Sequence, residues 1–198
     1  MEPTRSAALW ATAVAVPIAV LAGVLIFGQM TSGATPAAQP SLAPSSAAPA
    51  PTTAVPMAAP KLDARTAQVC LAVTSQLPVK VRDLAARPVT AGPEQNAAYG
   101  EPPLTVACGV DRPVMCATID GGDDCVPLDA ELLNMNRVCW YARTQSGATT
   151  FTTMDREVPV QVQVPSAYEQ AAQWANEFSD IVVQTDKSIT KGVPSGCA

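Results

Sequence analysis

Histidine is absent from the 198 residues of the sequence. This absence excludes serine or cysteine nucleophiles that histidine activates, histidine general-base catalysis, and zinc sites with a histidine ligand. The sequence also lacks Cys-x-x-Cys, the spacing of thioredoxin-like redox sites and zinc knuckles, and Gly-x-Ser-x-Gly, the nucleophile elbow of α/β-hydrolases. It therefore predicts no catalytic residue and no cofactor.

Basic residues are few and scattered. Twelve Lys and Arg residues stand against seventeen Asp and Glu residues, which gives a formal net charge of −5. Binding to nucleic-acid phosphates requires a concentrated basic surface. Nucleic acid is therefore not an expected partner.

Charge is missing altogether from residues 6–60. The apolar run Ala7 to Phe27 provides the roughly 20 residues that an α-helix needs to span a bilayer. Arg5 precedes this run, so the positive-inside bias predicts a cytoplasmic tail (1–6), a transmembrane helix (7–30) in contact with lipid, and an extracytoplasmic C-terminal domain. The alternative is a secreted protein, because Ser32-Gly33-Ala34 also suits signal-peptide cleavage.

Residues 31–60 contain seven prolines, which is typical of a disordered spacer; a proline-rich recognition motif is the less favoured alternative. Residues 61–198 regain charge, contain all six cysteines, and form the predicted domain.

Apolar periodicity within this domain predicts an α+β fold. A helix is expected from Asp63 to Leu77, followed by mostly irregular chain over 79–103. Strands are expected at 104–110, 138–143, 149–155 and 158–164, with a further hairpin around Asp120-Gly121 and a helix after the capping-box residue Ser166. The prediction is thus an antiparallel sheet of about four to five strands with one helix before it and one after it.

Six cysteines in an exported domain predict three disulfides, for which fifteen pairings are possible. Cys70 with Cys197 would tie down the C-terminal tail. Cys116 with Cys125 follows from the predicted hairpin, and Cys108 with Cys139 follows by elimination.

Acidic residues crowd the segment 111–131, where Asp120, Asp123 and Asp124 are the candidate calcium ligands. Their spacing does not match an EF-hand, so a solvated acidic turn is the favoured interpretation and no metal site is predicted.

Several short motifs occur in a characteristic order: Leu77-Pro78, Arg87-Pro88-Val89, Ala97-Ala98-Tyr99-Gly100-Glu101-Pro102, Val106-Ala107-Cys108-Gly109-Val110, and Phe151-Thr152-Thr153 with Arg156. Together they resemble an uncharacterised family of actinobacterial envelope proteins, classed as a domain of unknown function. The resemblance implies a single-span or secreted protein without catalytic residues. The chain departs from the family pattern at Tyr99, where Trp is usual, and at Met154-Asp155. The family pattern also bears on the disulfides. If the loop around Cys116 is a local elaboration, Cys108 with Cys125 becomes a rival pairing.

These features favour a non-enzymatic binding or accessory module of the cell envelope, with a wall component or envelope protein as its partner. The alternative is an exported carboxylate-dependent hydrolase acting on cell-wall material, because glycoside cleavage by two carboxylates needs no sequence motif. A calcium-stabilised adhesive domain is a third hypothesis.

Overall fold

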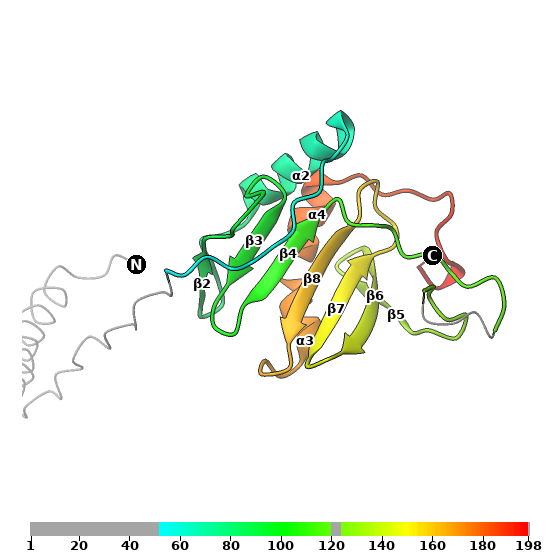
Figure 1. Cartoon of the computed structure of the whole chain (residues 1–198). Helices are drawn as coiled ribbons and strands as arrows, with labels where there is room; N and C mark the ends of the chain where they lie inside the picture. The colour runs from blue at the N-terminus through cyan, green and yellow to red at the C-terminus, as the bar shows by residue number, and fades with distance from the viewer. Residues whose placement is uncertain (1–51, 120–123, 198) are drawn as a thin grey trace, which may run out of the picture. The chain divides into compact units, whose positions relative to one another are not determined.

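The computed structural model describes residues 52–119 and 124–197, which form an antiparallel sheet with its α-helices on one face (Figure 1). The strands are β1 (Lys80–Val81), β2 (Leu84–Arg87), β3 (Asn96–Tyr99), β4 (Leu104–Cys108), β5 (Leu132–Met135), β6 (Val138–Gln145), β7 (Ala148–Thr153) and β8 (Val160–Pro165). The helices are α2 (Ala64–Gln76), α3 (Ala171–Asn176), α4 (Ser179–Thr185) and the 3-10 helix η1 (Ser195–Cys197).

The sheet consists of two meanders that meet in its middle. Its strand order is β1-β2-β3-β4-β8-β7-β6-β5, and every neighbouring pair is antiparallel. The strands β4 and β8 form the seam, where Val106 lies opposite Val162. The segment that connects β4 to β5 therefore has to pass from the middle of the sheet to its far edge.

Several predicted elements are confirmed. Asp63 caps α2 by accepting hydrogen bonds from the backbone N–H groups of Arg65 (2.9 Å) and Thr66 (3.1 Å). β6 and β7 form the predicted hairpin, and both turn residues, Ser146 and Gly147, have positive φ angles, as a tight hairpin turn requires.

The predicted fold class is wrong in the number of strands and in its helices. The sheet has eight strands rather than four to five, because β5 was not predicted and because β1, β2 and β3 lie in the segment 79–103 that was expected to be irregular. These strands have only two to four residues each, too few for apolar alternation to be visible. The expected C-terminal helix is two helices, α3 and α4, because the N–H groups of Glu177 and Phe178 bond to carbonyls three residues back and turn the chain.

The predicted membrane topology also requires correction. Within residues 52–119 and 124–197, no helix is both long enough and apolar enough to cross a membrane. The predicted single-pass membrane localisation is therefore not supported, and its segment, 7–30, lies outside the described residues.

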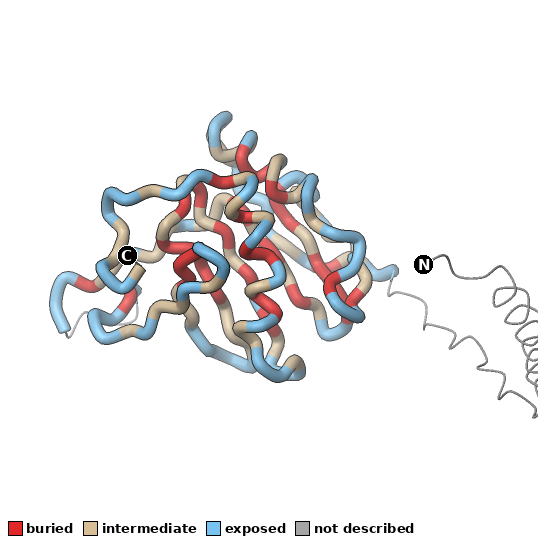
Figure 2. The backbone as a smooth tube through the Cα atoms, turned by 180° about the vertical axis from the view of Figure 1, so that it is seen from behind, coloured by how far each residue is buried: buried red, intermediate tan, exposed pale blue. Residues whose placement is uncertain are grey.

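The core lies between the sheet and its helices. α3 packs against β7 and β8, α4 packs against β6, and α2 packs against α4. The alternating valines of β8, Val160, Val162 and Val164, are fully buried beneath this layer. Figure 2 shows the buried positions gathered in the middle of the domain and the exposed ones along its outer loops.

Three disulfides brace the domain, as predicted in number: Cys70–Cys108, Cys116–Cys125 and Cys139–Cys197. Cys116–Cys125 is the predicted pair, although the flanking residues Met115 and Val126 form a parallel bridge rather than an antiparallel hairpin. The predicted turn at 120–121 lies outside the described residues.

The other two predicted pairs, Cys70–Cys197 and Cys108–Cys139, are wrong, and so is the rival pair Cys108–Cys125. Cys108 faces the helices together with Leu104 and Val106, and there it meets Cys70 of α2. Cys139 alternates with the core residue Trp140 and so points to the opposite face of the sheet, where Cys197 reaches it.

This connectivity predicts the result of removing Cys197. A Cys197→Ser variant should carry one free thiol, at Cys139, whereas the predicted pairing would have freed Cys70. Alkylation of the unfolded, unreduced variant followed by peptide mass mapping identifies the labelled cysteine. Label on Cys70 would contradict the structure.

Candidate functional site

The sheet face away from the helices is polar. Because side chains alternate along a strand, the residues between the β8 valines, Gln161 and Gln163, point away from the core. The strand register places Thr105 and Thr150 on either side of Gln163, and Ala107 and Thr152 on either side of Gln161. On β6, Arg143 lies opposite Thr150 and Tyr141 lies opposite Thr152, so the same surface continues there. We call the surface formed by these residues of β4, β8, β7 and β6 the open face.

The first wall beside the open face is an N-terminal segment, residues 55–62, which crosses β3 and β4 (Figure 1, cyan). Val55 forms a parallel bridge with Val89 and is only 5% exposed. The Asn96 side chain donates a hydrogen bond to the Ala58 carbonyl (2.9 Å). Residues 52–60 of the predicted spacer therefore belong to the folded domain; the rest of that spacer lies outside the described residues.

The second wall is formed by residues 111–114 and 124–126, which we call the loop wall. Arg112 anchors it by donating hydrogen bonds to the carbonyls of Met154 (3.0 Å), Glu157 (3.0 Å) and Arg156. The disulfide Cys116–Cys125 closes the loop covalently. The wall is thus fixed both to the β7–β8 turn and to itself.

Two hollows lie between these walls, and together we call them the groove. One, of about 830 Å³, lies between the N-terminal segment and strands β4 and β8. The other, of about 380 Å³, lies between the loop wall and strands β6 and β7. Asp111 and Gln161 line both hollows, so the two adjoin at these residues. Each volume is within the range of about 300–1,000 Å³ found for ligand pockets.

The groove has free hydrogen-bonding capacity. Gln161 donates to the Thr152 hydroxyl (3.3 Å). Within the described residues, by contrast, the side chains of Gln163 and Thr150 and the Tyr141 hydroxyl make no hydrogen bond. Amide and hydroxyl groups both donate and accept, so these three side chains can bind a polar ligand in either sense.

The predicted acidic candidates contribute only to the rim of the groove. Asp124 is exposed and lines the smaller hollow together with Asp111. Asp120 and Asp123 lie outside the described residues. Among residues 52–119 and 124–197, no three His, Cys, Asp or Glu side chains are grouped so that they could hold a metal ion.

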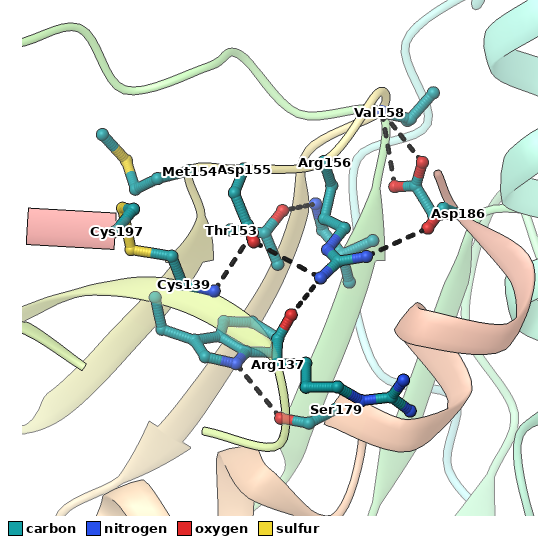
Figure 3. A network of polar contacts seen from close by, with 12 residues as sticks. Arg137, Cys139, Thr153, Met154, Asp155, Arg156, Val158, Ser179, Asp186 and Cys197 are labelled. Carbon is teal, nitrogen blue, oxygen red and sulfur yellow. Dashed lines mark hydrogen bonds and ion pairs between the residues drawn. A yellow bond between two sulfur atoms is a disulfide. The ribbon is translucent and has the colours of Figure 1, made fainter. Parts of the chain in front are cut away.

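A buried polar network fixes the end of the sheet next to β6 (Figure 3). The Arg156 side chain, 4% exposed, donates to the backbone carbonyls of Arg137 and Asp186 (3.3 Å to the latter) and forms an ion pair with Asp155 at 3.3 Å. The Asp155 carboxylate in turn accepts a hydrogen bond from the backbone N–H of Cys139 (3.0 Å). One guanidinium therefore joins β6, the β7–β8 turn and the end of α4.

Asp186 is a buried carboxyl of this network whose pKa is strongly raised. It is 2% exposed, and burial raises its pKa from 3.8 to about 6, against the lowering effect of the Val158 backbone N–H and of Arg156. Its carboxylate oxygens each accept from the Val158 N–H at 3.3 Å. A separate hollow of about 510 Å³ adjoins Asp186 and Arg156. Because its polar groups mostly bond backbone, we assign the network a structural role.

The residues of the groove floor were not among the predicted site residues. The signal for Gln161 and Gln163 was nevertheless present, because they alternate with the buried valines of β8. No sequence signal marks Asp186, a single carboxylate at the end of a short helix.

The fold and site define a disulfide-braced domain with one sheet, a helical layer on one face and a ligand-sized polar groove on the other. The chain belongs to the family described as "Protein of unknown function (DUF3515)", which matches residues 14–189. This confirms the predicted resemblance to a family of unknown function. No curated protein and no solved structure matches the chain.

Proposed function

We propose that this chain is an exported, non-enzymatic binding module whose ligand lies in the groove over the open face of the sheet. The observation that carries the proposal is the groove itself, two adjoining hollows whose floor carries amide and hydroxyl groups that no other protein group bonds within the described residues. Three disulfides are compatible with secretion into an oxidising space. The ligand is a component of the cell envelope, either wall material or an envelope protein.

Blocking the groove tests this proposal. Gln161 lines both hollows, so a Gln161→Trp substitution fills the junction between them. We expect the immobilised full chain to retain material from cell-envelope extracts, and the variant to retain less than a tenth of it. Gln184→Trp, which makes the same change at an exposed position of α4, should retain as much as the wild type. Circular dichroism checks that both variants fold. Equal retention by all three proteins would contradict a groove function.

The alternative function is hydrolysis by two carboxylates, because Asp111 and Asp124 line the same hollow. Binding is favoured because both residues are exposed to solvent, whereas the general acid of a glycosidase lies in a desolvated site. Release of reducing ends from wall polysaccharide, abolished in the Asp111→Asn/Asp124→Asn double variant, would establish the hydrolase instead.

A further inference from the structure

We infer that the groove binds a neutral oligosaccharide chain, an inference that rests on the proposed binding function. The floor side chains with free hydrogen-bonding groups, Gln163, Thr150 and Tyr141, each carry a group that donates and accepts. Sugar hydroxyls have the same dual character. A chain of hydroxyls can therefore satisfy this floor in many orientations without leaving a polar group unpaired.

The charges around the groove favour a neutral ligand. Besides Arg112, the charged residues that line its two hollows are two carboxylates, Asp111 and Asp124, and two cations, Lys61 and Arg143. The guanidinium of Arg112 is occupied by three backbone carbonyls. An anionic polymer would meet the two carboxylates and a cationic one would meet the two cations, so neither sign gains a complementary surface.

Tyr141 supplies an aromatic surface of the kind that sugar rings use. Its ring is half-buried, lines the smaller hollow and packs against the cluster of Val126, Cys139 and Met154. A ring fixed on one side by packing loses little further conformational freedom on binding. It can thus offer its apolar face to the C–H groups of a sugar while its hydroxyl bonds a neighbouring oxygen.

The edges of the sheet disfavour an extended peptide as the ligand. Peptides usually extend a sheet by pairing with the backbone of an exposed edge strand. Here the edge strand β1 has two residues. The other edge strand, β5, is covered by η1, where the Asn134 side chain donates to the Gly196 carbonyl (3.1 Å). The groove instead presents side chains on a sheet face, where no backbone pairing is available.

Affinity electrophoresis of the full, disulfide-bonded chain tests the inference. The gels contain a β-glucan, an α-mannan or an arabinogalactan as neutral probes, and polygalacturonate as an anionic probe. We expect at least one neutral polysaccharide to retard the chain and polygalacturonate not to do so. Tyr141→Ala should weaken the affinity about tenfold through loss of the ring, and Gln163→Ala should weaken it severalfold. Tyr141→Phe, which keeps the ring, should bind more tightly than Tyr141→Ala, and Gln184→Ala should bind like the wild type.

Two outcomes would overturn the inference. One is that none of the neutral polysaccharides retards the chain; the other is that Tyr141→Ala binds as tightly as the wild type. Treatment of the envelope extract before the capture experiment separates this failure from failure of the proposed function. If the Gln161→Trp variant retains no envelope material, and if protease but not periodate oxidation of sugar diols abolishes retention by the wild type, the groove is a binding site but its ligand is a peptide. If the Gln161→Trp variant retains as much material as the wild type, both the proposed groove function and the inferred oligosaccharide ligand are wrong.

Discussion

Replacing Arg156 by alanine is expected to lower the free energy of unfolding by about 3–5 kcal/mol. The Arg156 side chain is 5% exposed, and its guanidinium joins three separate segments and forms an ion pair with a carboxylate that is itself largely buried. Its loss leaves Asp155 and Asp186 without their nearby cation and leaves the carbonyl of Arg137 without its donor. Denaturant titration with the disulfides intact, followed by circular dichroism, measures the change.

The surface pair of Arg65 and Glu157 provides the matched control. Their side chains are 49% and 32% exposed, although the bond between them is short, at 2.6 Å. Solvent screens such a pair, so Arg65→Ala should lower the free energy of unfolding far less than Arg156→Ala does. If Arg156→Ala cannot be purified, Arg156→Lys can be measured in its place. Lysine keeps the positive charge but lacks the planar guanidinium that bonds several carbonyls at once, so we expect a smaller decrease in the free energy of unfolding than for alanine. A loss for Arg156→Ala no larger than that for Arg65→Ala would show that the buried network does not stabilise the fold.

The local elements that the sequence predicted share one property, which is that their signal lies within a single segment. Asp63 and Pro78 mark the limits of α2, and the alternating valines of β8 identify both its core face and its polar face. β2 and β3 have the sequences LAAR and NAAY, whose alanines carry little apolar contrast. These strands exist because β4 is available to pair with β3, which a local pattern does not encode.

The N-terminal wall of the groove could not be predicted from the sequence for a related reason. The N-terminal wall is attached through backbone contacts, in which the Val55 N–H donates to Pro88 (2.8 Å) and the Thr90 N–H donates to Val55 (2.9 Å). Such bonds do not depend on side-chain identity, so a proline-rich segment that docks has the same composition as one that does not.

Strand parity could have corrected one disulfide prediction without the structure. Cys108 lies two and four positions after the apolar residues Val106 and Leu104, so its side chain points to the same, apolar face of the sheet. Cys139 lies between Val138 and Trp140, so its side chain points to the face opposite to theirs. Two cysteines on opposite faces of one sheet have Cβ atoms that point away from each other, so their sulfur atoms cannot form a disulfide. The pairing of Cys139 with Cys197 depends instead on the path of the tail beyond α4, for which no parity argument exists.

Replacing Asp186 by asparagine is expected to change how stability depends on pH. The pKa of this buried carboxyl is raised from 3.8 to about 6, so between these values the folded chain keeps a proton that the unfolded chain has released. In the wild type this group therefore contributes stability that is present below about pH 4 and is lost as the pH rises through about 6. At about 1.4 kcal/mol per pKa unit, the lost contribution is about 3 kcal/mol.

The Asp186→Asn variant lacks this titration but keeps an oxygen that accepts from the Val158 N–H. Its free energy of unfolding minus that of the wild type should therefore rise by about 2 kcal/mol between pH 4 and pH 7, as measured by urea titration at each pH. Taking the difference cancels the opposite pH dependence contributed by Asp63, whose pKa is lowered by a hydrogen bond from the Thr66 side chain in both proteins. A difference for Asp186→Asn that does not vary with pH would mean that the carboxylate stays charged in the folded protein, with Arg156 compensating fully for its burial.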